Sequence, residues 1–346
     1  MKKLIFLTFL LIILSFVGCE KEKSYRVFNE VSFISDEKIL QEYFVTAIDF
    51  DSKGVAWIGT FNQGLIKYDH GYVTVYNTEN SPLDSSYIYD VKVDKKDVVW
   101  IGSNGLIKFD GNAFTRYDNS NSLIPENFVS AIAIDKINHL WLSSSRFQQG
   151  GLVEFDGTNW KLFTPDNSAM PCHLITDIEI DSLNNIWIAL GEKVNHVSLV
   201  KISNQNWSLI TDENFGFEPY YWGTLVSTPD NSVVASIDYG LSSLFDISRP
   251  NLIIGNKNKW KINNPTDAGG NSLGYVRTLC CDKKGLIWAA LDLNPEYKKL
   301  AVYNGQKWFV NNDNLESTDI FTMKADNENR IWLGTGSGIQ IIKSIE

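Results

Sequence analysis

The sequence predicts an all-β fold, a seven-bladed β-propeller built from four-stranded antiparallel blades. Two observations predict this fold: a ten-residue unit recurs seven times at intervals of 41 to 53 residues, and short strand-like segments flank every copy. Repeats with a period in the forties and with strand content are typical of propeller blades. We therefore expect seven similar sheets arranged in a ring around a central channel.

The repeated unit places an aspartate six residues before a tryptophan. Six copies are clear: DSKGVAWIGT (51–60), DKKDVVWIGS (94–103), DKINHLWLSS (135–144), DSLNNIWIAL (181–190), DKKGLIWAAL (282–291) and DNENRIWLGT (326–335). A degenerate seventh copy is PDNSVVASID (229–238), in which we align Pro229 and Ala235 with the aspartate and the tryptophan. The second-strand anchors are then Trp57, Trp100, Trp141, Trp187, Ala235, Trp288 and Trp332.

Each unit predicts four strands in a fixed order. The first strand is rich in apolar residues and ends at the aspartate, as in YFVTAIDFD (43–51), and a turn of Asn, Ser, Lys and Gly follows. We expect the aspartate to accept backbone N–H bonds in this turn. The second strand carries the anchor tryptophan, and the third starts near a Gly-Leu pair, as in GLIKYD (64–69). The fourth often holds a further tryptophan: Trp160, Trp207, Trp260 or Trp308.

Closure of the ring is predicted from the two ends of the repeat region. The seventh blade contains its first three strands, and no fourth strand follows them. The segment SYRVFNE (24–30) matches the fourth-strand pattern of YVTVYNT (72–78). We therefore expect residues 24–30 to complete the last blade, because this pairing removes two exposed sheet edges at once.

The repeats resemble a known family, the two-component regulator propeller repeat. The copy VTAIDFDSKGVAWIGTFNQGL (45–65) follows the pattern of that family almost throughout, and the resemblance covers about residues 25–346. The resemblance implies the extracytoplasmic sensor half of a hybrid two-component system, often with carbohydrate ligands. The repeats run to the end of the sequence without a kinase pattern, so the resemblance implies the fold more strongly than signalling.

The first residues differ from the rest of the chain. Lys2 and Lys3 precede an apolar run over 4–14, and SFVGC (15–19) follows. This order of basic, apolar and small residues is typical of a secretory signal, and it resembles a bacterial lipoprotein signal. We expect a signal peptide over 1–18, lipid on Cys19, a tether over 19–24 and a propeller over 25–346. The protein would then be lipid-anchored in the bacterial cell envelope; an uncleaved membrane anchor is the alternative.

Charge and cysteine content narrow the classes of partner. The formal net charge of −10 argues against a nucleic-acid partner, because phosphate binding needs a basic face. We interpret Cys172, Cys280 and Cys281 as small core residues, and one disulfide among them stays open. No His or Cys spacing predicts a metal site, so we expect no metal and no cofactor.

Trp222 is the one tryptophan of the eleven that the repeat does not require. It lies in EPYYWGT (218–224), and our alignment places it seven residues before the aspartate position. The same position holds Phe44, Tyr87, Phe128, Leu174, Tyr275 and Asp319 in the other blades, so these side chains are expected near the mouth of the channel. They would either form a stacking surface for a flat ligand or pack within the framework. We favour packing for Phe44 and Phe128, and both interpretations stay open for Trp222.

Loops between second and third strands are expected on the same face, where variable loops usually carry binding residues. A solvated rim is the alternative for each of them. The candidate ligand-binding residues from this face are Trp222, Tyr221, Tyr220, Tyr275, Arg277, Arg146, Phe147, Tyr87, Asp238, Tyr239, His196 and Tyr297.

Two functions remain open from the sequence. The first is a binding or sensor-like module that holds a carbohydrate, another small ligand or an envelope protein. The second is a metal-assisted lyase or hydrolase that uses the same mouth, by analogy of fold with propeller lyases that open streptogramin rings. His173 and Glu192 are the one His/Glu pair that we can place on this mouth. We interpret GTGSG (334–338) as a strand junction of blade seven.

Overall fold

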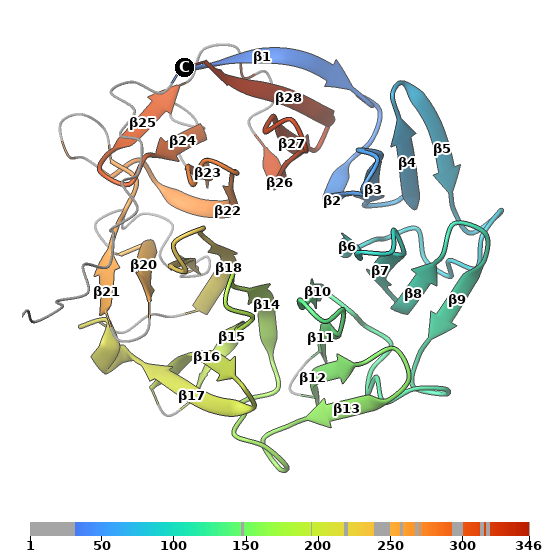
Figure 1. Ribbon diagram of the computed structural model, residues 1–346, viewed down its shortest axis with the longest axis horizontal. Coiled ribbons are helices and arrows are strands. Elements are labelled where there is room, and N and C mark those ends of the chain that lie inside the picture. The colour runs from blue at the N-terminus through green and yellow to red at the C-terminus, as the bar shows by residue number, and fades with distance from the viewer. Residues whose placement is uncertain are drawn as a thin grey trace, which may run out of the picture.

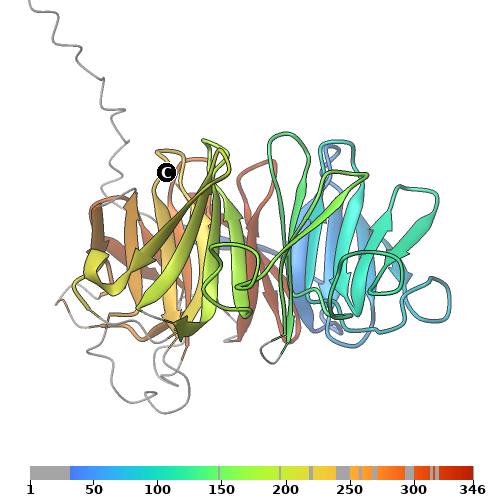
Figure 2. The same cartoon turned by 90° about the horizontal axis from the view of Figure 1, so that it is seen from below.

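The computed structural model describes residues 32–146, 149–194, 196–217, 221–238, 250–256, 259–266, 272–292, 300–311 and 319–345, with Gly270 and Leu315. These residues form seven four-stranded antiparallel sheets, which stand in a ring around a central opening (Figure 1). Seen from the side, the blades stand next to one another and the loops gather at two opposite faces of the ring (Figure 2). The predicted fold class is therefore confirmed.

Blades 1 to 6 are each built from four consecutive strands, blade 7 combines the last three strands with β1, and the innermost strand of each blade lines the opening (Figure 1). Blades 1 to 3 consist of β2 (Val45–Phe50), β3 (Ala56–Thr60), β4 (Leu65–Asp69) and β5 (Tyr72–Tyr76); β6 (Asp90–Val93), β7 (Val99–Ser103), β8 (Gly105–Phe109) and β9 (Phe114–Tyr117); and β10 (Ala131–Ile134), β11 (Leu140–Arg146), β12 (Gln149–Phe155) and β13 (Trp160–Phe163). Blades 4 and 5 consist of β14 (Ile175–Ile180), β15 (Ile186–Val194), β16 (Val197–Ser203) and β17 (Asn206–Thr211); and β18 (Tyr221–Ser227), β19 (Val233–Asp238), β20 (Leu252–Asn256) and β21 (Lys259–Ile262). Blades 6 and 7 consist of β22 (Tyr275–Cys281), β23 (Ile287–Asp292), β24 (Leu300–Tyr303) and β25 (Trp308–Asn311); and β26 (Ile320–Ala325), β27 (Ile331–Thr335), β28 (Gly338–Ile345) and β1 (Ser32–Ile39). A short 3-10 helix, η1 (Asp212–Asn214), follows β17.

The ring closes as predicted, by an N-terminal strand that completes the last blade. Strand β1 pairs antiparallel with β28, from Ser32 opposite Ile345 to Ile39 opposite Ile339. The described closing strand consists of Ser32–Ile39, and the predicted segment 24–30 lies outside the described residues. A tight turn explains the observed choice: Tyr43 donates its N–H to the carbonyl of Leu40, so β1 leads directly into β2.

The hairpin aspartate explains the spacing of the repeat. In blade 4, one carboxylate oxygen of Asp181 accepts the N–H groups of Leu183 and Asn185, both at 2.9 Å. Its other oxygen accepts the indole N–H of Trp187 at 2.9 Å. The aspartate therefore caps the turn and holds the anchor indole six residues later, as the corresponding pairs do in the blades of Trp100, Trp141, Trp288 and Trp332. The predicted turn-capping role is confirmed.

The anchor indoles pack between neighbouring blades. The ring of Trp57 lies 5.6 Å from that of Phe109 in blade 2, and the ring of Trp100 lies 6.0 Å from that of Phe155 in blade 3. Trp332 contacts Tyr68 of blade 1 at 5.9 Å across the closure. Each indole thus fills the space between its own sheet and the next one along the chain.

Our alignment of blade 5 was wrong by one residue. The N–H of Thr228 bonds to the carbonyl of Ser232, which is the bond that Asp181 makes to Asn185 in blade 4. Val226 lies opposite Val234, as Glu179 lies opposite Trp187. Thr228 and Val234 therefore occupy the aspartate and tryptophan positions, in place of Pro229 and Ala235. The acid of this hairpin has moved into the turn, where Asp230 accepts the N–H of Ser232 at 3.1 Å, and this shift misled the alignment.

Cys172 and Cys280 are buried, Cys281 is half-buried, and all three thiols are free. Within the described part of the chain, no helix has the length and apolar character needed to cross a membrane.

Candidate ligand-binding site at the central channel

The first strands of the blades surround a channel cavity of about 620 Å³. One position of the repeat, five residues before the hairpin aspartate or its equivalent, lines this cavity in every blade. The residues at this position are Thr46, Tyr89, Ser130, Thr176, Gly223, Arg277 and Phe321. The channel surface is therefore set by the position in the repeat, and its chemistry varies from blade to blade.

A β-bulge turns this position toward the channel. The pairing register shifts across Thr176 in blade 4, Arg277 in blade 6 and Phe321 in blade 7, and similar shifts occur in blades 1 and 5. A bulge inserts one extra residue into a strand and re-aims the side chains beside it. The preceding residue, such as Ile175, stays in the buried core.

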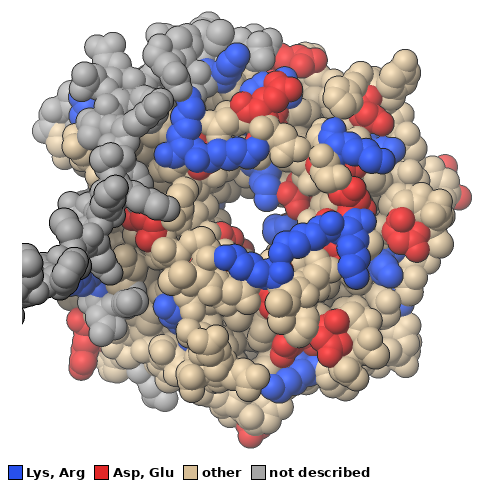
Figure 3. All heavy atoms as spheres, viewed as in Figure 1, with Lys and Arg blue, Asp and Glu red and all other residues tan. Residues whose placement is uncertain are grey.

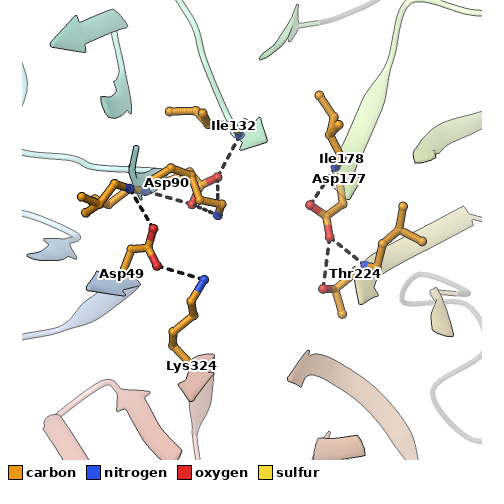
Figure 4. A network of polar contacts seen from close by, with 11 residues as sticks. Asp49, Asp90, Ile132, Asp177, Ile178, Thr224 and Lys324 are labelled. Carbon is orange, nitrogen blue, oxygen red and sulfur yellow. Dashed lines mark hydrogen bonds and ion pairs between the residues drawn. The ribbon is translucent and has the colours of Figure 1, made fainter. Parts of the chain in front are cut away.

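Carboxylates in the channel fasten neighbouring first strands to each other. Asp90 accepts the backbone N–H of Ile132 in the next blade at 2.8 Å, and Asp49 accepts that of Val93 at 2.8 Å (Figure 4). Asp177 accepts the N–H of Leu225 at 2.7 Å. These bonds satisfy backbone donors that no strand pairing reaches, because first strands of adjacent blades do not form a common sheet.

Two lysines neutralise part of this charge. The ammonium of Lys92 lies 2.9 Å from Asp90, and that of Lys324 lies 2.9 Å from Asp49. Burial alone would lower the pKa of Lys92, but Asp90 and Asp49 outweigh it and raise this pKa above its ordinary value. Asp49 likewise raises the pKa of Lys324, so both lysines carry their charge at neutral pH.

Asp177 and Glu179 form the acidic side of the channel. Asp177 lies across the opening from Asp90 and Lys324 (Figure 4). Burial raises the pKa of Asp177 to about 7, although the N–H of Leu225 acts in the opposite direction. Burial also raises the pKa of Glu179, whose carboxylate accepts bonds from the N–H and hydroxyl of Ser227. The charge of this side therefore changes close to neutral pH.

A continuous row of aromatic rings curves over blades 7, 1, 2 and 3. Adjacent ring centroids lie 4.5, 5.4, 4.7, 4.3 and 4.7 Å apart along the row. Arg277 of blade 6 extends the row, because its guanidinium lies 4.5 Å from the ring of Phe321. We call this row the aromatic arc; in spatial order its rings are Phe321, Phe44, Phe61, Tyr87, Tyr89 and Phe128.

The aromatic arc borders the channel and is open to solvent. Tyr89 and Phe321 line the channel cavity itself. Phe61 is 46% exposed, although its ring contacts those of Phe44 and Tyr87. Apolar faces beside a few convergent polar groups are typical of small-molecule sites. The arc and the channel carboxylates together therefore form the candidate site.

Two of the predicted site residues belong to this site, Tyr87 in the aromatic arc and Arg277 beside Phe321. Phe44 and Phe128, for which we favoured packing, are half-buried members of the arc. His196 is exposed at the β15–β16 turn, where its ring pairs with Asp212 at 2.7 Å.

Trp222 is a framework residue and offers no surface to a ligand. Its side chain is 2% exposed, and it packs with Trp187 and Leu225 between blades 4 and 5. The one-residue correction explains this placement, because Trp222 takes the core position that Ile175 holds in blade 4. Tyr275 is also buried, at 8% exposure. In the corrected alignment, Tyr221 takes the position seven residues before Thr228, which is the position expected near the mouth.

The remaining predicted residues are not tested by the structure. Tyr221, Arg146 and Asp238 lie in β18, β11 and β19, but their side chains are outside what the structure describes. Tyr220, Phe147, Tyr239, Tyr297 and the proposed lipidation site Cys19 lie outside the described residues.

Several residues of the site escaped the sequence analysis: Phe61, Tyr89, Phe321, Asp90, Lys92 and Asp177. A signal for most of them was present, since charged and aromatic residues recur two to five positions before the hairpin aspartate. Strict strand alternation hides this signal, because the bulge breaks the period of two.

Within the described part of the chain, no hydrogen bond or ion pair joins His173 to Glu192. The ring nitrogen Nδ1 of His173 lies 2.9 Å from the backbone oxygen of Gly150. Across the described residues, no group of three or more His, Cys, Asp or Glu side chains is placed to hold a metal ion. The glycine-rich GTGSG segment is a strand junction as predicted, since Thr335 lies opposite Gly338 in the β27–β28 hairpin.

Fold and site together define a seven-bladed propeller with an aromatic-edged, charged channel. No family model matches the chain, and no curated protein matches it. Among solved structures, it is similar to the extracellular domain of a hybrid two-component system of B. thetaiotaomicron, with a TM-score of 0.65 and 19% identity over 90% of this chain and 40% of the other.

Enzymes share the same fold. The chain is similar to virginiamycin B lyase from Staphylococcus aureus, with a TM-score of 0.66 and 10% identity over 91% of this chain and 100% of the lyase. It is also similar to the GH74 enzyme of Niastella koreensis, with a TM-score of 0.62 and 14% identity over 86% of this chain and 52% of the enzyme. The chain spans about 40% of the length of the extracellular two-component domain, and identities this low show the fold alone.

Proposed function

We propose that this protein is a binding module of the cell envelope, which holds a carbohydrate at the aromatic arc and the adjoining channel. The observation that carries the proposal is the arc itself, six rings in contact at the border of a charged cavity. A framework needs no exposed row of this kind, since exposed apolar patches usually mark interaction sites.

The chemistry of a carbohydrate fits both parts of the site, the aromatic arc and the charged channel. One face of a pyranose ring presents C–H groups, which pack on an aromatic ring, and its edge presents hydroxyl groups. Asp177 and Glu179 can accept hydrogen bonds from hydroxyls, while Arg277 and Lys92 can donate them. A few polar groups of this kind fix the orientation of a ligand within an apolar site.

A sensor role in an envelope signalling system is a further part of the proposal. Support comes from the resemblance of the repeats and from the similarity in fold to an extracellular two-component domain. Anchoring through lipid on Cys19 would hold the module at the envelope, and mass spectrometry of the mature protein tests that step.

A catalytic role in the same channel is the second candidate. The observation that favours it is Asp177, because burial raises its pKa to about 7, close to the value that suits a general acid or base. Turnover of a bound oligosaccharide by the wild type and its loss in Asp177→Asn would support catalysis.

The test of the binding proposal is a glycan-array screen followed by isothermal titration calorimetry. Phe61→Ala removes an exposed ring of the aromatic arc, so it should weaken binding at least tenfold and leave the melting temperature nearly unchanged. Tyr72→Ala is the matched control, because Tyr72 is 81% exposed on the outer strand β5. Equal affinity of Phe61→Ala and Tyr72→Ala would overturn the proposal.

A further inference from the structure

The interface between blades 5 and 6 lacks its anchor indole. Six blades carry a tryptophan at the second-strand position, and blade 5 carries Val234 there. The hairpin aspartate that would hold the indole N–H is replaced as well, by Thr228. Both members of the repeat's defining pair are therefore missing from the same blade.

A cavity of about 340 Å³ opens at this interface. Its walls include Thr228, Ile254, Ile287 and Tyr303. Val234 belongs to the hydrophobic cluster that contains Ile287 and Tyr303, and Ile254 packs against that cluster. The cavity therefore adjoins the hydrophobic cluster of the shortened side chain, and the strands that line it are β20 and β21 of blade 5 and β23 and β24 of blade 6.

The intact interfaces show what this space normally holds. In blade 2, the indole of Trp100 reaches Asp94 with its N–H at 3.3 Å and contacts the ring of Phe155 in the next blade at 6.0 Å. Thr228 is the counterpart of Asp94, and Tyr303 is the counterpart of Phe155. Both counterparts line the cavity, so it borders the part of the interface that an anchor indole fills in blade 2.

The rim of the cavity is positively charged overall. Lys259, Lys261 and Lys284 line it together with one acid, Asp230. In a protein whose net charge is −10, three lysines at one opening favour a ligand with an anionic group. Figure 3 shows that Lys and Arg side chains also gather near the central opening of the face in view, so basic groups are concentrated locally on this acidic molecule.

We propose that the cavity between blades 5 and 6 binds a small aromatic acid. The planar ring takes the place of the missing indole against Tyr303, and the carboxylate lies at the lysine rim. A cavity of about 150 Å³ is enough for benzene, so this larger one accommodates a fused two-ring system. The proposal stands on the blade 5 substitutions and does not depend on the channel site.

The test uses 5-fluoroindole-3-acetate as the probe, observed by ¹⁹F NMR line broadening on the full chain. We expect saturable binding with a Kd of about 1 mM or tighter, as for small ligands of this size. Val234→Trp restores the repeat's own indole, so it should weaken probe binding at least tenfold without lowering the melting temperature. Ile262→Trp is the matched control, because Ile262 is exposed on the outer strand β21 and does not line the cavity.

A second variant tests the rim without touching the core. The double variant Lys259→Glu/Lys261→Glu changes exposed residues and should weaken binding of 5-fluoroindole-3-acetate at least threefold. Binding of neutral 5-fluoroindole should stay unchanged. Phe61→Ala should leave the probe affinity unchanged, which separates this site from the aromatic arc. Absence of saturable binding up to 10 mM probe, a folded Val234→Trp protein that binds like the wild type, or an unchanged affinity in the double lysine variant would overturn the proposal.

Discussion

Replacement of Trp222 by alanine tests whether this residue belongs to the framework. Its side chain is 2% exposed and lies in the hydrophobic cluster of blades 4 and 5, with the ring of Phe215 at 5.4 Å. The sequence alone left a ligand-facing role open for this residue. The structure assigns it the buried position that Val45 and Ile88 hold in blades 1 and 2.

The magnitude follows from this burial. Truncation of a buried tryptophan to alanine costs about 3–5 kcal/mol, because contacts are lost and a cavity remains. For roughly 300 ordered residues, an unfolding entropy of about 2.1 cal/mol/K per residue gives about 0.6 kcal/mol/K. Trp222→Ala should therefore lower the melting temperature by about 5–8 °C.

Differential scanning calorimetry of the wild type and the variant measures this shift. Tyr72→Ala removes an aromatic ring that is 81% exposed, so it should change the melting temperature by less than about 1 °C. A shift below about 1 °C for Trp222→Ala would refute the framework assignment. It would also return this residue to the candidate ligand-binding surface.

Three further predictions concern single groups. Asp181→Ala removes the acceptor of the turn N–H groups and of the Trp187 indole, so it should lower the melting temperature by about 2–5 °C in calorimetry. The raised pKa of Asp177, about 7, means that the folded state binds an extra proton between about pH 4 and pH 7. Wild-type stability should fall relative to Asp177→Asn as pH rises through this window, and a constant difference in melting temperature would contradict the assignment. Burial raises the pKa of the Cys172 and Cys280 thiols to about 12, so a thiol reagent such as DTNB should modify them in guanidinium chloride but not in native buffer.

The framework was predictable because one local interaction repeats. An aspartate that caps a hairpin and holds an indole six residues later leaves a fixed spacing in the sequence, as Asp181 and Trp187 show. Blade 5 was misaligned because its acid, Asp230, caps the turn from within it. No spacing rule reveals such a shift, since the pairing of β18 with β19 sets the register.

The site was predicted less completely than the fold. Tyr87 was predicted from the alignment of the first strands, and Arg277 because it lies two residues after Tyr275; the ligand-binding role of both stays a prediction. Phe61 was missed, because it lies just after β3. Its ring takes its place in the aromatic arc between the rings of Phe44 and Tyr87. The closing strand was placed in the right blade, but its bounds depend on the turn at Leu40, which the strand pattern does not contain.

The central claim is that ligands bind where the aromatic arc borders the channel. Hydroxyl-radical footprinting, with and without the glycan that the array identifies, tests it directly by measuring the oxidation rate of individual aromatic residues. Our account predicts that the ligand protects Phe61, Tyr87 and Tyr89, while Tyr72 on the outer strand is oxidised at the same rate. Protection of Tyr72 or of other outer-strand residues, with unchanged oxidation of the three arc residues, would contradict the account.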